Sequence, residues 1–448
     1  MNKDIIAVNA AKLTSLILKV LHFGAATSMP GIIASSISPK ILSRLVNQTK
    51  KEIIAITGTN GKTTSANFLS AILQKDNRRV AHNKKGANML TGVTAAVVEC
   101  ADIKARLNAD NCILECDEAY LQKFADYFLA DYLIVTNLFR DQLDRYGELD
   151  TTAKMIKKAV DKFQKNDKFT TVLNADDPTI LSLAGANSIY FGFDDIEYEK
   201  PDENISANAE AATCKCGKDI KYTKIYYGHI GHYYCDCGLA RPKTFVSAKA
   251  KILVDHSIIK IYSEEYGYDF EVSVNLPGVY NAYNALSAIV LSLKLGIKPE
   301  IISQAFENYQ TVFGRAEKRI INGKNVLVQL IKNPAGTSEV LRTVKDDPKS
   351  KILIIINDDY ADGRDVSWLW DANFELINSN QKQIITSGIR YADMAVRLKY
   401  AGIPAENIVM KSNIKQAIDY ALKETMPDEK LYILPTYTAL LKMQKILK

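Results

Sequence analysis

The sequence predicts an α/β protein in which a doubly wound domain is followed by a second, smaller α/β domain. Between residues 50 and 200, short apolar runs alternate with longer helical patterns, and the alternation restarts at about Lys318. A Gly-rich turn that ends in Lys62 separates the first apolar run of this region from the first helical pattern. Such alternation is typical of a parallel sheet covered by helices on both faces.

The composition is that of a soluble globular protein with a weak positive charge. Hydrophobic residues make up 47% of the chain and charged residues 24%, which is ordinary for this class. A length of 448 residues leaves room for roughly three domains with their own cores. The formal net charge of +6 suits a negatively charged substrate or a membrane surface, but it does not require nucleic acid as a partner.

Residues 1–50 are predicted to form a helical segment that packs on the domain that follows. The stretch "AKLTSLILKVLHFGAATSMPG" is apolar, but it carries Lys12 and Lys19 and shows no cleavage signal. No uninterrupted apolar run in the chain reaches the roughly 18 residues that span a bilayer. A helix packed on the protein is the favoured interpretation, and a helix that touches a membrane surface stays open beside it.

The first α/β domain is predicted from near-continuous apolar runs, which are typical of buried parallel strands. These runs are "EIIAIT" from Glu52, "CILEC" from Cys112, "YLIVT" from Tyr132 and "TVLN" from Thr171. Helical patterns lie between them, so each run is interpreted as one strand of a doubly wound sheet.

The turn "TGTNGKTTSANF" is interpreted as a phosphate-binding loop that opens a helix near Lys62. Gly58 and Gly61 permit a tight turn in which backbone N–H groups approach phosphate oxygens. Lys62 can reach the β and γ phosphates, and Thr63 can place its hydroxyl on Mg²⁺. The usual spacing of such loops wants Gly at position 56, where this chain has Ile56. A Gly-rich helix entry that binds no nucleotide is the alternative.

An insertion at about 205–245 changes the character of the sequence to a stretch rich in Cys, Gly and Tyr. It holds two cysteine pairs, Cys214 with Cys216 and Cys235 with Cys237. Four thiolates around a tetrahedral Zn²⁺ would fold a small ribbon that lacks a core of its own. The usual knuckle is C-x-x-C and the first pair is C-x-C, so reduced cysteines in a degenerate ribbon are the alternative.

The remaining cysteines and the nearby histidines have simpler interpretations. Cys100, Cys112 and Cys116 lie in or near apolar segments and are predicted to be buried thiols. A reducing cytoplasm with a metal site fits the cysteine pattern better than disulfides do. His229 and His232 are spare ligand candidates, but each is more simply a residue of the hairpin between the cysteine pairs.

After the insertion, β-like runs precede a helix predicted from about Tyr280, and then the closing α/β domain begins. Its strands are predicted at "VLVQL", "KILIIIN", "QIITS" and "LYILP". Its helices are predicted at Ser338–Lys345, Ala392–Ala401 and Ile414–Lys423.

The closing domain carries an acidic loop, "NDDYADGRDVSWLWD", after one of its predicted strands. Its aspartates are Asp358, Asp359, Asp362, Asp365 and Asp371. Such a cluster is usually a solvated loop, but loops at strand ends of α/β sheets are also where sites lie. Trp368 and Trp370 are candidates for interface anchors, and burial in the domain core explains them equally well.

Several of these motifs together resemble the Mur ligase family, to which folylpolyglutamate synthase is also similar. "GTNGKTT" resembles the ATP loop of that family, and "LECDEAY", "TNLFRDQLDRYGELD", "LNADDP", "GVYNAYNALSA" and "FGRAEK" follow in the family's order. One position departs from the pattern, because Gln142 stands where His is usual. The family makes amide bonds by phosphorylating a carboxylate with ATP and letting an amine attack.

The resemblance implies roles for individual residues. The ATP loop would comprise Gly58, Thr59, Asn60, Gly61, Lys62, Thr63 and Thr64. Glu115 would bind Mg²⁺ together with Thr63. Asn284, and after it Asn281, would lie near the adenine, and Arg315 would face the phosphates.

The closing domain is similar to that of the MurT family, the synthetase subunits that act with the glutaminase GatD on lipid II. The stretches "LIKNPAGTSEV", "SGIRYADMAVRLKYAG" and "LPTYTAL" carry this similarity, although Ser338 and Thr436 stand where Asn is usual. The similarity implies a GatD-like glutaminase as partner and Asp365, with Asp358 and Asp362 after it, as the residue that completes its catalytic triad. It also implies a cytoplasmic protein that approaches the inner face of the membrane to reach a lipid-linked substrate.

The sequence therefore predicts a Mur-ligase-like central ATP-binding domain at 51–317 with a four-cysteine zinc-ribbon insertion, followed by a Rossmann-like α/β domain at 318–448. The expected reaction is ATP-dependent amidation of the α-carboxyl of D-glutamate in the lipid II stem peptide, with Lys62, Glu115 and Asp365 as catalytic residues. No glutaminase signature is visible in this chain. A stand-alone Mur- or folylpolyglutamate-type amino-acid ligase is the alternative, and a nucleotide-binding scaffold without chemistry is a third hypothesis.

Overall fold

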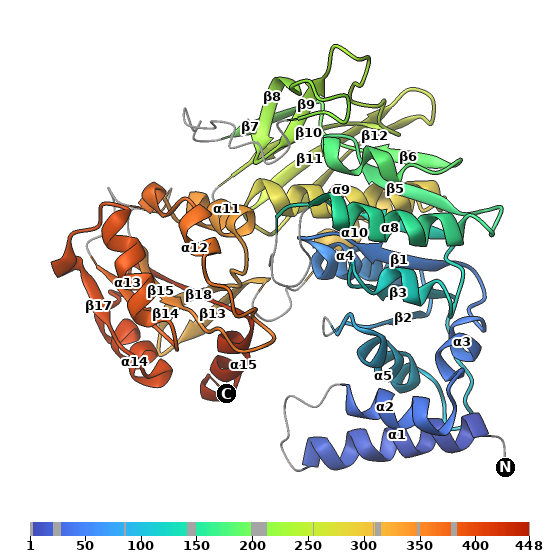
Figure 1. The fold of residues 1–448 in the computed structure, drawn as a ribbon, viewed down its shortest axis with the longest axis horizontal. Coiled ribbons are helices and arrows are strands. Elements are labelled where there is room, and N and C mark those ends of the chain that lie inside the picture. The colour runs from blue at the N-terminus through green and yellow to red at the C-terminus, as the bar shows by residue number, and fades with distance from the viewer. Residues whose placement is uncertain are drawn as a thin grey trace.

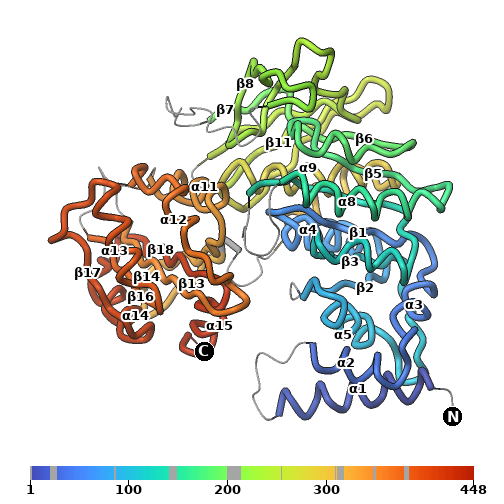
Figure 2. Tube along the Cα trace, in the orientation of Figure 1, coloured from blue at the N-terminus to red at the C-terminus, as the bar shows by residue number. Residues whose placement is uncertain are grey.

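The computed structural model of the chain has three parts, which follow one another in the sequence. It describes residues 3–20, 28–84, 87–140, 149–198, 213–253, 255–307, 309, 315–345, 347, 350–377 and 383–447. Figure 1 shows the N-terminal helices in blue below the central part, and the C-terminal part in orange and red beside it. Figure 2 traces the chain through these three regions in the same order.

The central part is built on a parallel sheet with the strand order β2-β3-β1-β4-β5-β6. Its strands are β1 (Ile53–Thr57), β2 (Val80–His82), β3 (Asn111–Glu115), β4 (Tyr132–Val135), β5 (Thr170–Asn174) and β6 (Ser188–Phe191). β1, β3 and β5 are buried along their whole length, as expected for strands covered on both faces. Because the strand order reverses beside β1, the loops after β1, β3 and β4 meet at the carboxyl edge of the sheet.

Helices cover both faces of this sheet. They are α4 (Lys62–Lys75), α5 (Leu90–Cys100), α6 (Leu121–Phe124), α8 (Leu149–Phe163), α9 (Val279–Lys294), α10 (Pro299–Glu307) and the 3-10 helix η1 (Pro178–Leu183). α4, α9 and α10 pack together in the core on one face. α5 and α8 belong to the core on the opposite face. The helix that follows the Gly-rich turn therefore lies between the sheet and α9.

The N-terminal helices pack against the second of these cores. α1 (Lys3–Val20) lies on α2 (Met29–Ile37), both contact α5, and α3 (Ile41–Val46) leads into β1. Gly31 allows α2 to approach α5 closely, because a Cβ atom there would lie 1.9 Å from the carbonyl oxygen of Thr91. None of the described helices combines the length and the apolar character that crossing a bilayer requires.

A second sheet and a small hairpin extend the central part beyond β6. The sheet has the order β12-β11-β10-β7, and the hairpin pairs β8 with β9. The bounds are β7 (Asp195–Tyr198), β8 (Lys221–Tyr227), β9 (Ile230–Tyr234), β10 (Ser247–Ile252), β11 (Ser257–Ser263) and β12 (Tyr268–Val274). Figure 1 shows the β8–β9 hairpin above β5 and α9.

The C-terminal part is a separate α/β sheet with the order β13-β14-β18-β15-β16-β17, parallel except for β13. The strands are β13 (Arg315–Ile321), β14 (Lys324–Gln329), β15 (Ser350–Ile355), β16 (Ile384–Ser387), β17 (Ile408–Met410) and β18 (Lys430–Pro435). The helices are α11 (Pro334–Lys345), α12 (Trp368–Asp371), α13 (Tyr391–Tyr400), α14 (Ile414–Glu424), α15 (Tyr437–Ile446) and the 3-10 helices η2 (Phe374–Ile377) and η3 (Ala405–Asn407). Separate apolar cores lie on its two faces.

The structure confirms the strands that the apolar runs predict in both α/β parts, and the helices expected around α9, α11, α13 and α14. The domain boundaries at 50/51 and 317/318 stay predictions. The family-like stretch at residues 141–147, which holds Gln142, lies outside the described residues.

Candidate functional site

The Gly-rich turn after β1 adopts a conformation that only glycine accommodates at two positions. Gly58 and Gly61 have φ angles of +124° and +87°, in the region that L side chains rarely adopt. A Cβ atom on Gly58 would lie 2.3 Å from the Thr136 hydroxyl oxygen, and one on Gly61 would lie 1.9 Å from the Asn284 amide oxygen. The turn is therefore packed tightly between the loop after β4 and α9, with its backbone at the start of α4.

The loop after β4 holds the turn in place through hydrogen bonds. The Thr59 hydroxyl accepts from the Phe139 N–H at 3.0 Å and donates to the Phe139 carbonyl oxygen at 3.1 Å. The Asn60 N–H donates to the side-chain oxygen of Asn137 at 3.0 Å. These contacts hold the turn against "TNLF", the first part of the family-like motif after β4.

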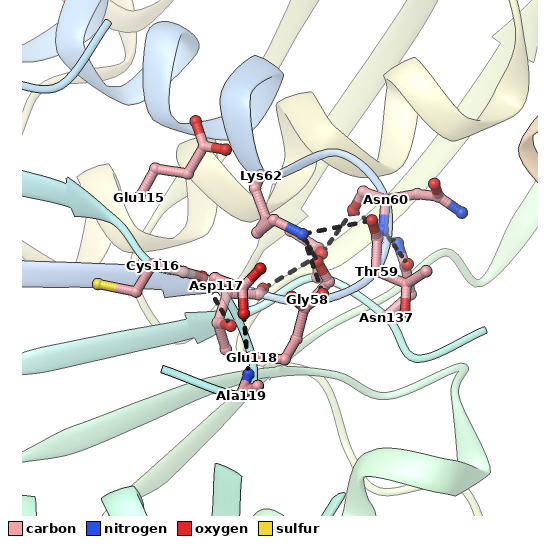
Figure 3. Close-up of polar contacts among 12 residues, drawn as sticks. Gly58, Thr59, Asn60, Lys62, Glu115, Cys116, Asp117, Glu118, Ala119 and Asn137 are labelled. Atoms are coloured by element: carbon pink, nitrogen blue, oxygen red, sulfur yellow. Dashed lines mark hydrogen bonds and ion pairs between the residues drawn. The ribbon is translucent and has the colours of Figure 1, made fainter. Parts of the chain in front are cut away.

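Lys62 is the first residue of α4, and its ammonium group is buried among oxygen atoms, as Figure 3 shows. Its Nζ donates to the Gly58 carbonyl oxygen and lies 2.9 Å from Glu118 Oε1. Burial lowers the pKa of Lys62, but the facing carboxylates of Glu118, Glu115 and Asp117 outweigh burial and raise this pKa above its usual value. The ammonium therefore stays charged and can form an ion pair with a phosphate group.

Thr63 and Glu115 form a pair of oxygen ligands beside Lys62. The Thr63 hydroxyl donates to Glu115 Oε2 at 2.8 Å, and both residues are buried. Asn83 fixes the Glu115 backbone, since its side chain accepts from the Glu115 N–H at 2.8 Å and donates to the Glu115 carbonyl oxygen at 2.9 Å. A threonine hydroxyl and a carboxylate are hard oxygen donors of the kind that Mg²⁺ takes, so the predicted pair fits that ion.

Glu118 is a residue of this site that the sequence argument did not single out. It is 4% exposed and pairs with Lys62. Burial raises the pKa of Glu118, and the neighbouring ammonium opposes that rise. An acidic residue in the loop directly after a buried strand was the available signal, since the carboxyl end of β3 lies beside the carboxyl end of β1.

A cleft runs from the turn toward the C-terminal part and contains about 670 Å³ of open space. Its lining comes from the turn and α4 (Asn60, Gly61, Thr64), the β4 loop (Asn137), the hairpin (Tyr227), α9 (Tyr280, Asn281, Asn284) and the C-terminal part (Gln329, Leu330, Lys332, Asn333, Ala335, Gly336, Glu339, Val340). The structure thus brings the predicted asparagines of α9 to the same cleft as the phosphate loop.

Asn333 links the C-terminal part to the phosphate loop across this cleft. Its Nδ2 donates to Asn60 Oδ1 at 2.9 Å, while its own Oδ1 accepts from the Gly336 N–H at 2.9 Å. Asn333 thereby caps the start of α11. Asn333 was not among the predicted site residues, although Asn followed by Pro334 is a helix-start signal. Lys332 adds a positive charge to the wall of the cleft and lowers the pKa of Glu118 against the larger effect of burial.

Arg315, the predicted phosphate-facing residue, is the first residue of β13, and its backbone pairs with Gln329. Its side chain lies outside the described residues, so its predicted role stays a prediction.

The four cysteines of the insertion come together at the open end of the β8–β9 hairpin. The Sγ atoms of Cys214 and Cys237 are 3.7 Å apart and those of Cys216 and Cys235 are 3.6 Å apart, with all four ligand atoms within 4.8 Å of one another. Four sulfurs at about 2.3 Å from one tetrahedral Zn²⁺ would be about 3.8 Å apart. The donor set and its spacing fit that ion.

Both cysteine pairs, and not only the first, have C-x-C spacing, and they fold alike. The N–H groups of Cys214 and Cys235 donate to the carbonyl oxygens of Lys218 and Leu239 at 2.8 and 2.7 Å. Gly217 and Gly238 then turn the chain with φ angles of +83° and +96°. The tighter spacing is therefore accommodated by two matching turns.

The two histidines of the hairpin are hairpin residues, as predicted, and not members of the cysteine cluster. His232 Nε2 lies 2.7 Å from the Phe193 carbonyl oxygen. His229 is fully buried with its Nε2 3.2 Å from Asp177 Oδ1, but neither ring nitrogen has hydrogen-bond geometry to a described residue. The distance marks an ion-pair contact when the ring is protonated.

In the acidic loop of the C-terminal part, three of the carboxylates contact a cation or a hydroxyl group. Arg390 makes two hydrogen bonds to Asp358 Oδ2, at 2.7 and 3.0 Å. Lys442 Nζ lies 3.1 Å from Asp359 Oδ2. The Thr438 hydroxyl lies within hydrogen-bond distance of the carboxylates of both Asp359 and Asp362, and its one proton is donated to either of them. The carboxylates of the loop are thus neither uniformly solvated nor gathered into one site.

Asp365 differs from these three aspartates. Among the described residues its carboxylate makes one hydrogen bond, from the Ser367 N–H at 2.8 Å, and it is half-buried. Trp368 packs on the domain core, whereas Trp370 is 52% exposed with its ring 5.4 Å from that of Tyr400, which is 74% exposed. The core interpretation therefore holds for Trp368, and Trp370 keeps the features of an interface anchor.

Comparison with known families matches both α/β parts of the chain. Residues 56–292 match the family model described as Mur ligase middle domain, and residues 330–440 match the one described as MurT ligase C-terminal.

Comparison with individual proteins agrees with this. The chain is 35% identical over 434 residues to the lipid II isoglutaminyl synthase (glutamine-hydrolyzing) subunit MurT of Streptococcus pneumoniae, covering 95% of this chain and 93% of that protein. It is 32% identical to the subunit of the same name from Staphylococcus aureus, covering 93% and 92%. Among solved structures, a pseudomurein peptide ligase type C from Methanothermus fervidus has a TM-score of 0.66 at 23% identity, over 91% of this chain and 79% of that one. This last similarity shows the shared fold.

Proposed function

The chain belongs to the MurT family, and from this membership we propose that it is the ATP-dependent synthetase subunit of a lipid II isoglutaminyl synthase that uses glutamine as its source of ammonia. The proposed substrate group is the α-carboxyl of D-glutamate in the lipid II stem peptide. The observation that carries the proposal is the buried group formed by Lys62, Thr63 and Glu115, next in the sequence to Gly61 and Thr64, which line the cleft between the central and C-terminal parts.

The proposed reaction has two steps. A carboxylate oxygen of the substrate attacks the γ-phosphorus of ATP, ADP leaves, and an acyl phosphate forms. Ammonia then attacks the carbonyl carbon, the nitrogen loses a proton, and phosphate leaves, which gives D-isoglutamine. Both steps move negative charge between oxygens, so fixed positive groups that face those oxygens supply most of the catalysis.

The residues of this chain supply such groups. Lys62 is held charged at the first turn of α4, and the N–H groups at the start of that helix add positive partial charge. Bound Mg²⁺ would neutralise the transferring phosphoryl group, and Thr63 and Glu115 are the residues that would hold it. Lys332 lines the cleft from the C-terminal part and is a second cation for the phosphate end.

The proposed partner is a GatD-like glutaminase, because the proposed reaction needs ammonia. A glutaminase needs a Cys thiolate, a His and a group that orients the His. Asp365 is our candidate for the orienting group, since Asp358 and Asp362 are already bound by Arg390 and Thr438. The exposed ring of Trp370 beside this loop suits an interface at the same place.

The cysteine cluster is proposed to hold a structural Zn²⁺. Metal analysis of protein purified without added zinc should find about one equivalent, as one closed four-ligand site binds one ion. A Cys216→Ser and Cys235→Ser double variant should lose the metal. Protein that contains no metal and still shows an ordered hairpin would contradict the assignment.

The outer face of α1 is proposed to approach the membrane that carries the lipid-linked substrate. Leu13, Leu16, Ile17 and Val20 are 59%, 58%, 48% and 66% exposed, and their spacing places them on one face of the helix. Sedimentation with anionic phospholipid vesicles tests this. Leu16→Asp with Ile17→Asp should abolish the binding, and unchanged binding would refute it.

Reconstitution tests the function as a whole. The chain with ATP, Mg²⁺, lipid II and ammonium should release ADP and convert D-glutamate to D-isoglutamine, and glutamine should replace ammonium only when the glutaminase partner is present. A stand-alone amino-acid ligase would instead join a free amino acid to its substrate without a partner. Amino-acid addition by the lone chain, or no ATP turnover with lipid II, would refute the proposal.

A further inference from the structure

The turn of the β8–β9 hairpin is buried, which is unusual for a hairpin tip. Tyr227, His229 and Ile230 are 3%, 0% and 0% exposed. Gly228 between them has a φ angle of +53°, and a Cβ atom there would lie 2.7 Å from the Phe139 ring. The cysteine cluster lies at the opposite end of the hairpin, so the ribbon inserts its far end into the central part.

The hairpin tip rests on the same loop that holds the phosphate loop. The Phe139 ring centroid is 4.5 Å from that of His229 and 5.7 Å from that of Tyr227. The backbone of Phe139 exchanges two hydrogen bonds with the Thr59 hydroxyl, as described above. Asp177 links the loop after β4 to the hairpin tip. Its Oδ2 accepts from the Leu138 N–H at 3.0 Å, and its Oδ1 faces His229.

Tyr227 is the residue of the ribbon that reaches the cleft itself. It lines the cleft with Asn137, Asn281 and Asn284. Its ring packs edge-on against Tyr283 of α9 at 5.6 Å, so Phe139 and Tyr283 support it from two elements. A rigid aromatic ring beside amide side chains is the usual wall of a site for a purine base.

The arrangement of the cleft orients a nucleotide. Gly61 and the start of α4 mark the phosphate end, since backbone N–H groups and Lys62 lie there. The base would then lie against other residues of the lining, among which are Tyr227, Tyr280 and Asn281. Tyr280 is the other tyrosine of the described lining, and it is less buried than Tyr227.

We propose that Tyr227 forms the wall on which the purine base of the nucleotide packs, so that the ribbon insertion is part of the nucleotide site. This inference rests on the proposed ATP-dependent function. It assigns a ligand-contacting residue to the insertion, and it predicts that damage to the hairpin weakens binding of the base without removing the phosphate contacts.

Titration calorimetry of the full chain with ADP, and separately with pyrophosphate, tests the proposal. Tyr227→Leu should weaken ADP binding roughly ten-fold, the size expected when a base loses an aromatic stacking partner, and should leave pyrophosphate binding unchanged. Tyr227→Phe keeps the ring and should bind ADP nearly as the wild type does. Tyr234→Leu, on the exposed side of the same hairpin, is the matched control and should change neither affinity.

Other outcomes overturn the proposal in distinguishable ways. ADP binding by Tyr227→Leu equal to that of the wild type excludes the contact. Equal loss of ADP and pyrophosphate shows that Tyr227 only supports the phosphate loop through Phe139. Loss of ADP affinity in Tyr280→Leu alone assigns the base to Tyr280. A wild-type chain that binds neither ADP nor pyrophosphate overturns the proposed function together with this inference, whereas loss of pyrophosphate binding in Lys62→Ala supports the assignment of the phosphate end.

Discussion

The central sheet and the C-terminal sheet both carry acidic loops at their carboxyl edges, but the surroundings of the acidic side chains differ. At the central sheet, Glu115 and Glu118 are 2% and 4% exposed and face Lys62 and Thr63. At the C-terminal sheet, Asp359 is 44% exposed and pairs with Lys442, whereas Asp358 is buried but pairs with Arg390, whose side chain is 37% exposed. The first edge is closed by protein, and the second is partly open to solvent.

This difference indicates what each edge can do alone. A buried group of opposite charges acts strongly on a ligand, because little water screens it. An exposed loop gains that strength only when another surface covers it. Under the proposed function, the central edge would carry out phosphoryl transfer with its own residues, and the C-terminal edge would supply half of a site that the proposed glutaminase completes.

The largest expected effect tests the open edge. Asp365→Asn should lower glutamine-driven amidation by about 10⁴, the loss typical when the third member of a catalytic triad can no longer orient the imidazole. Amidation with free ammonia should stay unchanged, because the phosphate loop is untouched. Asp371→Asn, a change of the same kind in the same acidic region, is the matched control.

Two results would contradict this role of Asp365. Equal loss of the ammonia-driven reaction would place Asp365 in the synthetase site or in the fold. Normal glutamine hydrolysis by the variant complex would show that no group of this loop orients the partner's histidine.

The next effect tests the closed edge. Lys62→Ala should lower ATP turnover with lipid II and ammonia by about 10²–10³, the usual cost of losing one preorganised electrostatic contact. Lys75→Ala removes an equal charge from the exposed far end of α4 and should have no such effect. Normal turnover in Lys62→Ala would contradict the site assignment.

His82, at the same edge, tests whether water reaches the interior beside the central site. His82 ends β2, is 6% exposed, and neither ring nitrogen has a hydrogen-bond partner among the described residues. Burial, with a smaller contribution from Lys84, lowers the pKa of His82 from its usual value near 6.5 to about 3. Between about pH 6.5 and about pH 3, the unfolded chain therefore binds a proton at His82 and the folded state does not.

The sign of the pH effect follows from this. Above about pH 6.5 neither state binds the proton, and as the pH falls below that value only the unfolded state gains it, so stability is lost toward about pH 3. Between about pH 7.5 and about pH 5 the wild type should lose about 2 kcal/mol more than His82→Leu does, at about 1.4 kcal/mol per pH unit inside the window. Chemical unfolding at the two pH values measures this. An equal loss in both proteins would mean that water reaches the ring.

The sequence predicted best what depends on neighbouring residues. The Gly-rich turn could be predicted because Gly58, Gly61 and Lys62 lie close together in the sequence and follow an apolar strand. The cysteine cluster could be predicted for the same reason, since each pair is local and only one hairpin separates the pairs. The strands of both sheets were predicted because burial on two faces makes them apolar along their length.

The residues that were missed make contacts between distant segments. Glu118 meets Lys62 across 56 positions, and Asn333 meets Asn60 across 273. Tyr227 was one tyrosine in a stretch rich in Tyr, and only the buried hairpin tip distinguishes it. Propensity and spacing describe local structure, so they carry no signal for pairs of this kind.

The smallest expected effect tests the link between the two regions. Asn333 caps α11 with its oxygen and binds Asn60 of the phosphate loop with its amide nitrogen. Asn333→Ala should cost about 1 kcal/mol of stability as a lost helix cap, and it should also weaken ATP binding several-fold, because a lost hydrogen bond of this kind is worth about 1 kcal/mol.

Two variants separate the cap from the link. Asn413 caps α14 of the same domain, where its side chain accepts from the Gln416 N–H at 3.1 Å, so Asn413→Ala should cost similar stability and leave ATP affinity unchanged. Asn333→Ser keeps a cap but is too short to reach Asn60, so it should preserve stability and still weaken ATP binding. Thermal unfolding and titration with ATP measure both quantities. If Asn333→Ser binds ATP like the wild type, the contact between the two regions contributes nothing to the closed edge, and the central sheet forms its site without the C-terminal part.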